Sequence, residues 1–122
     1  MPTKVFDDKN NFVGTVAKDG IIRDRFNMKK GFVLEDGSLQ DTLRIKIGWV
    51  EEDGTQRNRF DQRVGFLDAE GKVRSLSGVK VGHVTQIEDT NRKFAGAAAY
   101  LLVIVELHKR KTQILRIKEL GL

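Results

Sequence analysis

A seventeen-residue repeat constrains the fold of this chain more than any other feature of its sequence. Glycines recur at that interval, at Gly14, Gly31, Gly48, Gly65 and Gly82. A second glycine series keeps the same interval, with an Asp or Glu before each member: Gly20, Gly37, Gly54 and Gly71. Two series of residues that keep the same interval without insertion or deletion indicate a repeat protein, in which each unit is one supersecondary element.

Each unit has the pattern of a β-hairpin. In the unit from Gly31 to Ile47, a short strand at 32–34 is followed by Glu-Asp-Gly-Ser. An Asp-Gly pair is typical of a tight turn because it adopts the positive φ angles that such turns need. Residues 39–47 then alternate between apolar and polar side chains, as a half-buried strand does. We therefore predict one short and one long strand per unit. Gly48 opens the next unit, where a glycine permits a sharp turn or a close backbone approach.

The two flanks of the repeats complement each other. Residues 3–13 match the long strand of a unit, and His83-Val84-Thr85 matches the short strand. Paired together, they would form a fifth hairpin and close the array, which removes exposed sheet edges. An open solenoid would instead need a capping unit at each end. We predict a mainly β fold in which five hairpin repeats close radially, like a small propeller.

Units of the form Gly-x-Val-x-x-Asp-Gly-x-Ile-x-Asp give the chain a resemblance to a known class of domain. Gly14 to Asp24 carries the whole motif, and the tandem copies cover residues 3–88. The chain resembles the small bacterial β-flower domains of four-fold and five-fold type. The resemblance implies a radial hairpin fold and supplies no catalytic residues, because those families are largely uncharacterised.

The C-terminal part departs from the repeat. Residues 94–105 are uncharged and rich in alanine, which favours an apolar helix over 92–111, although 103–105 would also suit a strand. A helix that is apolar on every side is expected to be buried all round. Either the axis or mouth of the β ring or a helix of another subunit could bury it. We predict a single domain (1–122) with repeats over 3–88, this helix, and a basic amphipathic tail over 112–122. The candidate partner or homo-oligomer interface is Tyr100, Leu101, Leu102, Ile104 and Val105.

Charge is unevenly placed along the chain. Residues 1–91 hold fifteen basic and fifteen acidic residues, whereas 92–122 hold seven basic and two acidic residues, so the net charge of +5 belongs to the C-terminal part. The absence of cysteine fits a reducing compartment. No apolar leader is visible near the N-terminus, and the longest uncharged stretch has twelve residues, fewer than the roughly 20 of a spanning helix. We expect a cytoplasmic protein without a membrane span.

One polar series interrupts the apolar face of the long strands. Its members share a repeat position: Asp7, Asp24, Asp41, Asn58 and Ser75. If they converged on an axis, their oxygens would resemble the ligands of a hard cation such as calcium. The interpretation we favour is that each side chain accepts a hydrogen bond from a nearby backbone N–H, a role that Asn and Ser fill as well as Asp.

The opposite face of the same strands is basic. A candidate anion-binding set is formed by Arg23, Arg25, Arg44, Arg57, Arg59 and Arg74. Such a face is the electrostatic signature of a nucleic-acid or anion surface, but it lacks the exposed aromatic residues of a base-stacking platform. A solvated outer face is the alternative that we favour. Phe32, Trp49 and Phe66 share another repeat position, at which core packing is preferred over a ligand pocket.

No arrangement of residues indicates catalysis. The two histidines, His83 and His108, stand apart from cysteines and clustered acids, so we expect neither a metal nor a cofactor. No nucleophile and base pattern can be assembled. We predict a non-catalytic binding or scaffold module whose helix mediates oligomerisation or partner docking. The alternative is a protein that binds nucleic acid or another anion through the basic strand face and the tail.

Overall fold

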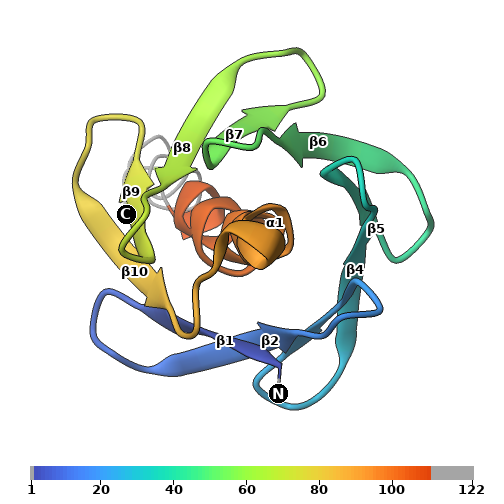
Figure 1. Ribbon diagram of the computed structural model, residues 1–122, viewed down its shortest axis with the longest axis horizontal. Helices are drawn as coiled ribbons and strands as arrows, with labels where there is room; N and C mark the ends of the chain where they lie inside the picture. The colour runs from blue at the N-terminus through green and yellow to red at the C-terminus, as the bar shows by residue number, and fades with distance from the viewer. Residues whose placement is uncertain (1, 111–122) are drawn as a thin grey trace, which may run out of the picture.

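The structure, a computed structural model, describes residues 2–110 and is mainly β. Ten strands form one closed antiparallel barrel in which consecutive strands pair with each other. Figure 1 shows the barrel along its axis, with the C-terminal helix at its centre. The strands are β1 (Thr3–Asp7), β2 (Phe12–Val16), β3 (Ile21–Asp24), β4 (Lys29–Val33), β5 (Ser38–Asp41), β6 (Lys46–Val50), β7 (Thr55–Asn58), β8 (Arg63–Leu67), β9 (Lys72–Ser75) and β10 (Lys80–Val84).

The first and last strands close the barrel. In the β1–β10 pair, Val5 lies opposite Val84 and Asp7 lies opposite Gly82. The N–H of Thr85 also donates to the carbonyl oxygen of Lys4 at 2.9 Å, which extends this pairing beyond β10. The closure that the two flanks predicted is therefore confirmed as a closed antiparallel barrel, and every strand has two partners.

Each predicted long strand is in fact two strands separated by a second turn. Residues 42–45 form such a turn between β5 and β6, with Arg44 at a φ of 66°. The alternation of apolar and polar residues continues through this turn, so the pattern alone did not mark the break. Leu43 and Ile45, predicted to lie on the buried face, are 77% and 53% exposed. Gly48 accordingly lies within β6 and not at the start of a unit.

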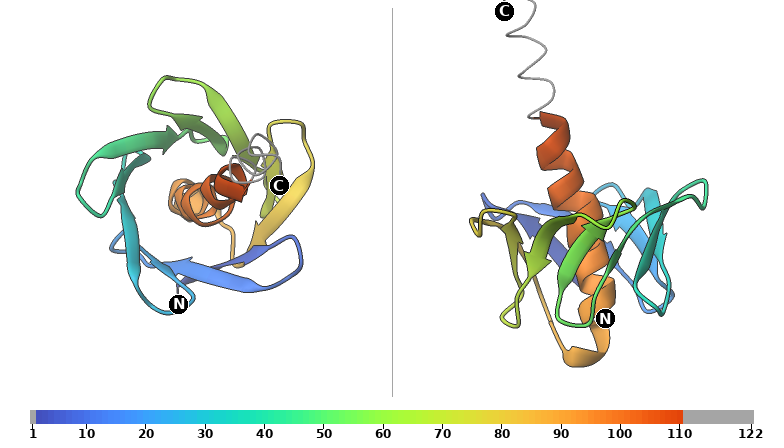
Figure 2. Two further views of the ribbon diagram at one scale, coloured as in Figure 1. Left: turned by 180° about the vertical axis from the view of Figure 1, so that it is seen from behind. Right: turned by 90° about the horizontal axis from the view of Figure 1, so that it is seen from above.

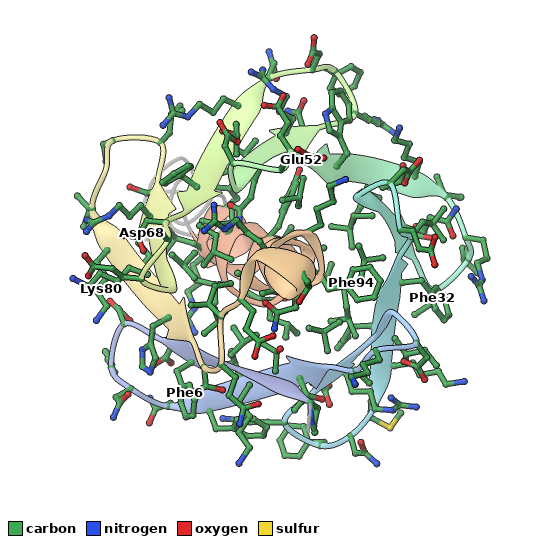
Figure 3. All side chains as sticks on the ribbon, viewed as in Figure 1. Phe6, Phe32, Glu52, Asp68, Lys80 and Phe94 are labelled. Carbon is green, nitrogen blue, oxygen red and sulfur yellow. The ribbon has the colours of Figure 1, made fainter. Side chains whose placement is uncertain are left out.

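The barrel interior is aliphatic, and the repeated aromatic residues lie outside it. Gly48 and Val50 are buried, whereas Trp49 between them is only half-buried because successive side chains in a strand alternate between faces. The guanidinium of Arg44 covers the Phe32 ring at 3.7 Å, and the ammonium of Lys46 lies 5.0 Å from the Trp49 ring centroid. Figure 3 shows Phe32 on the outer side of the wall and Phe94 on the inner side. The prediction that these aromatics form the core is wrong.

A helix occupies the lumen. It consists of a 3-10 turn, η1 (Asp89–Asn91), then α1 (Arg92–Ala99), a π-helical turn, η2 (Tyr100–Ile104), and a further α-helical segment to residue 110. Residues Ala95–Ala99 are all buried, so the helix is enclosed on every side, as its composition predicted. The barrel axis, and not another subunit, provides this burial (Figures 1 and 2). Residue 111 and the predicted tail at 112–122 lie outside the described residues.

Five glycines of the wall meet five consecutive residues of η2. A methyl group placed on Gly48 would lie 2.9 Å from Tyr100 Cε2, and one on Gly31 would lie 2.8 Å from Leu101 Cδ2. The remaining three pairs, at 2.6, 3.4 and 3.1 Å, are Gly14 with Leu102, Gly82 with Val103, and Gly65 with Ile104. In each case the added methyl group would also overlap an atom of the neighbouring strand, so these glycines permit close packing both within the wall and against the large side chains of the helix.

The π-helical form of η2 suits this arrangement. An α-helix advances by about 100° per residue, so the fifth residue of a turn would lie almost over the first. The wider π turn spreads five side chains more evenly around the axis. The N–H of Val105 donates to the carbonyl oxygen of Tyr100, five residues earlier, as a π turn requires. The local departure from the α-helix thus matches the number of wall glycines.

Candidate functional site

The two ends of the barrel differ in sequence and in shape. Five turns surround the opening through which the helix leaves, and we call this end the exit rim (7–13, 24–30, 41–47, 58–64 and 75–81) (Figure 2). The other end, the opposite rim, consists of four turns (17–20, 34–37, 51–54 and 68–71) and the connection to the helix (85–91). The two rims alternate along the chain because successive strands run in opposite directions.

The predicted polar series holds the turns of the exit rim. Asp24 Oδ1 accepts hydrogen bonds from the N–H groups of Phe26 and Met28 at 2.9 and 3.0 Å. Asp41, Asn58 and Asp7 accept two such bonds each in their own turns, and the hydroxyls of Ser75 and Ser77 lie 3.0 Å apart. The side chains are thus used locally, within separate turns. Within residues 2–110, no cluster of three or more His, Cys, Asp or Glu side chains could hold a metal ion.

These hydrogen bonds affect the ionisation of Asp7. Its slight burial raises the pKa of the carboxyl, but the N–H groups of Asn11 and Lys9 and the Asn11 side chain outweigh this effect. The net result is a pKa of Asp7 below its usual value. This acid therefore stays charged while it holds its turn.

The turns held in this way expose large apolar side chains. Of the nine such side chains that are exposed among the described residues, eight lie on the exit rim, and Leu34 lies on the opposite rim. Phe12, at 37%, is the least exposed of the eight. The other seven are 53–77% exposed, and we call them the apolar crown: Phe26, Met28, Leu43, Ile45, Phe60, Leu76 and Val79. Solitary exposed apolar residues need no explanation, but their concentration at one end of a barrel marks a contact surface.

Charge is also separated between the two ends. The exit rim together with helix residues 105–110 holds eleven basic and six acidic residues, net +5. The opposite rim together with the helix start, Arg92 and Lys93, holds ten acidic and three basic residues, net −7. Acids around the helix N-terminus and cations around its C-terminus complement the helix dipole, which accounts for the sense of the separation. The dipole does not account for the exposed apolar residues.

The six arginines of the predicted anion-binding set fall into two groups. Arg25, Arg44 and Arg59 lie on the exit rim, where Arg25 and Arg59 stack over Phe26 and Phe60 at 4.8 Å. Arg23, Arg57 and Arg74 lie on the outer wall within strands. Arg57 Nε lies 2.7 Å from Glu51, and Arg74 Nε lies 3.2 Å from Asp68. Acidic neighbours thus offset much of the wall charge, while the rim cations lie beside the apolar crown.

The helix does not fill the mouth of the barrel. A groove of about 330 Å³ lies beside it on the exit rim, and its lining includes both cations and acids, among them Arg25, Lys30, Arg110, Asp7, Asp24 and Glu106. A second hollow of about 370 Å³ lies on another side of the helix, between Leu76, Leu107 and His108. The exit rim is therefore an uneven surface, with apolar tips and shallow hollows.

The residues predicted as a partner interface lie mainly inside the barrel. Tyr100, Leu102 and Ile104 are buried, and Leu101 and Val105 are half-buried. A second subunit could reach the buried three only after the helix had left the lumen. Burial also raises the pKa of the Tyr100 hydroxyl. Each of these residues except Val105 faces one of the wall glycines, so their role in this structure is to fill the barrel.

The apolar crown is the feature that sequence reasoning missed. All of its residues except Leu76 continued the apolar side of the strand alternation and were assigned to the buried face. A signal was present, because the turn residues with φ between 62° and 87° recur every seventeen residues at Asn10, Asn27, Arg44, Asp61 and Gly78. Asn, Asp and Gly favour this left-handed conformation, which would have placed a turn there.

Among the described residues, no helix is both long and apolar enough to cross a membrane. His83 is stacked on the Phe6 ring, with centroids 4.8 Å apart, and so has a packing role. Comparison of the chain with family models, curated proteins and solved structures found no match.

Proposed function

We propose that this protein is a non-catalytic binding module that docks on its partner through the exit rim. The observation that carries the proposal is the segregation of large exposed apolar side chains, since eight of the nine within residues 2–110 lie on one end of the barrel. The polar series supports it, because Asp24, Asp41 and Asn58 accept hydrogen bonds from the backbone of turns whose tips are apolar. The filled barrel then serves as a rigid scaffold for these turns.

The proposal includes the finer architecture that the repeats predict, five hairpins closed radially. Support comes from one pair of positions that recurs around the barrel with its register intact: Gly14 with Asp24, Gly31 with Asp41, Gly48 with Asn58, Gly65 with Ser75, and Gly82 with Asp7. An experimental structure whose wall segments failed to superpose after a shift of seventeen residues would contradict it. Membership of the β-flower class remains a prediction of the same kind.

Docking through the rim differs from the oligomerisation that the sequence suggested. The apolar helix is already buried by its own barrel, so the crown is the better candidate for a contact surface. Nucleic-acid binding through the strand face has less support, because Glu51 and Asp68 pair with the wall residues Arg57 and Arg74. Self-association and nucleic-acid binding are therefore outcomes that the following experiment distinguishes.

Site-specific photo-crosslinking in living cells that produce the full chain tests the proposal. A photoreactive phenylalanine analogue replaces Phe26, Leu43 or Phe60 on the crown and, as the matched control, Leu34 on the opposite rim. Docking through the exit rim predicts adducts at the three crown positions in several-fold excess over those at Leu34. The mass and the nuclease, protease or lipase sensitivity of the adducts identify nucleic acid, a second copy, another protein or lipid.

Equal yields of adduct at Leu34 and at the crown would refute the proposal. A crown variant that combines Phe26→Ser, Leu43→Ser and Phe60→Ser provides an independent check, with the analogue placed at Met28. The adducts at Met28 are expected to disappear in this variant, while its unfolding transition stays close to that of the parent because the three side chains are exposed.

A further inference from the structure

We propose that the partner of the exit rim is the surface of an anionic lipid bilayer, onto which the barrel docks with its axis upright. This inference rests on the proposed function and names the partner of the same surface. The apolar crown would enter the boundary between headgroups and acyl chains, and the surrounding Lys and Arg side chains would contact the headgroups.

The distribution of the apolar residues favours a fluid partner. Phe26, Leu43, Phe60 and Leu76 stand on four separate turns around the barrel mouth, with the helix between them (Figure 2). A protein partner is normally met by a compact apolar centre that a polar rim surrounds. Separate tips around an opening suit an interface that adapts to each of them, as a lipid headgroup region does.

Basic side chains lie beside the residues of the apolar crown. Arg25 and Arg59 lie over Phe26 and Phe60 and extend their charge at the level of these rings. Four further cations of the exit rim are exposed: Lys29, Lys46, Arg63 and Lys80. Long basic side chains can place their aliphatic stems along apolar matter while the charged group stays at the polar boundary. Apolar residues flanked by cations are the combination that holds proteins at anionic interfaces.

The charge on the opposite rim sets the orientation. The exit rim with helix residues 105–110 is net +5, and the opposite rim with Arg92 and Lys93 is net −7, so an anionic surface attracts one end of the barrel and repels the other. The separation of charge between the two ends therefore favours one orientation at a charged surface. Exposed acids such as Glu52, whose carboxylate lies 3.9 Å from the Lys93 ammonium at the helix start, would face the solvent.

Vesicle binding tests this inference directly. The full chain is mixed with vesicles of phosphatidylcholine alone or with about 30% phosphatidylglycerol, at low and at high salt, and bound protein is measured by flotation. We expect binding to the anionic vesicles at least tenfold tighter than to the neutral ones, and weaker binding as salt screens the cations. The crown variant should lose at least tenfold in affinity, and Leu34→Ser should leave the affinity unchanged.

Tryptophan fluorescence reports the orientation. In a Trp49→Phe background, Phe60→Trp places a single tryptophan on the crown, and Leu34→Trp places one on the opposite rim as the control. On anionic vesicles, the emission of the first should shift to the blue and be quenched by lipids brominated in the acyl chains. The emission of the second should not change.

The outcomes separate this inference from the proposed function. Crown adducts to protein or nucleic acid, combined with no binding to anionic vesicles at low salt, would overturn the bilayer inference and leave rim docking intact. Binding that the crown variant retains in full, or equal quenching at both tryptophan positions, would also overturn the bilayer inference. Failure of the crown to form adducts of any kind would refute both.

Discussion

Gln56 is the most deeply buried polar residue of the barrel within residues 2–110. Its side chain is fully buried, and Nε2 donates to the carbonyl oxygen of Gly96 in the helix at 2.9 Å. Oε1 has no hydrogen-bond partner among the described residues. A buried polar atom without a partner lowers stability, so Gln56 ties the helix to β7 at a cost.

Replacing this side chain should reveal the cost. Gln56→Leu is expected to raise the free energy of unfolding by about 1 kcal/mol, because it removes the unpaired oxygen and keeps the volume. Gly96 still accepts a hydrogen bond from the N–H of Tyr100, and Leu39 already fills the matching position in β5. Gln56→Ala should lower the free energy of unfolding by about 2 kcal/mol through the cavity that it leaves.

Urea unfolding followed by circular dichroism measures both variants. A Gln56→Leu variant less stable than the parent would show that the single hydrogen bond to Gly96 outweighs the unpaired oxygen. The ordering of Leu above Gln above Ala is therefore the decisive result.

The carboxyl group of Asp36 is expected to contribute to the pH dependence of the free energy of unfolding. A hydrogen bond from the N–H of Ser38 to its Oδ1, at 2.9 Å, is the main reason that the pKa of Asp36 is lowered in the folded state. A lowered pKa in the folded state means that this group stabilises the fold above its unfolded pKa of about 3.9. The contribution is lost as pH falls further, through the folded pKa.

Asp36→Asn should reduce this acid sensitivity. The amide oxygen can accept the same hydrogen bond, as Asn58 does in a turn of the exit rim, so stability near neutral pH is expected to change little. The urea midpoint should fall less between about pH 5 and pH 2.5 in the variant than in the parent protein. Identical pH profiles for the two proteins would show that this turn does not contribute to the pH dependence.

At the scale of the elements, the π turn is the feature that the sequence could not have indicated. The apolar run 94–105 predicted a buried helix, and the repeat predicted a closed wall. The pairing of five wall glycines with Tyr100–Ile104 could not be predicted from either pattern alone. It depends on how the strands surround the helix in three dimensions. The turn at 42–45 and its equivalents were missed for a different reason, because apolar residues such as Leu43 are exposed there against the usual pattern.

Deleting one residue of η2 should be far more harmful than a change just beyond it. Without Leu101, the residues after the deletion would shift by one position along the helix and rotate away from the wall glycines that they face. We expect a loss of roughly 3 kcal/mol in the free energy of unfolding, as for a large cavity in a core. An alanine inserted between Lys109 and Arg110 adds a residue outside the barrel and should change stability by less than about 0.5 kcal/mol.

Urea unfolding of the two variants compares them under one condition. Equal stability of the Leu101 deletion and the insertion would contradict the assignment of one η2 residue to each wall glycine. A drop confined to the deletion would support it.

At the scale of the whole molecule, wall and helix form one cooperative unit. The buried core joins nine wall residues, from Val5 to Val84, to the helix residues Ala95–Ile104. Neither part can keep its apolar surface from water without the other. The closed wall, its strand order through β1 and β10, and the buried helix were all predictable, since they follow from period, flanks and composition. The rims were not, because their role depends on which turns meet at one end.

Hydrogen exchange in the native state should show this cooperativity. The amides of Ala98 to Val103 are expected to exchange only through global unfolding, with the same free energy as the urea transition. The amides of Leu107 to Arg110, beyond the barrel, should exchange orders of magnitude faster in the same helix. Fast exchange at Ala98 together with slow exchange in β5 and β6 would mean that the helix leaves the lumen while the wall stays folded.

The position of the helix in the chain has a consequence for biosynthesis. The ribosome completes all ten strands before it releases Arg92–Ile104, yet these strands surround a space that only those residues fill. A nascent chain that has reached β10 therefore contains all the strands of the wall but lacks the helix that fills the barrel. Folding must wait for the helix, and a chain that stops before Arg92 would be left with an unfilled apolar ring, which makes it a ready substrate for chaperones and proteases.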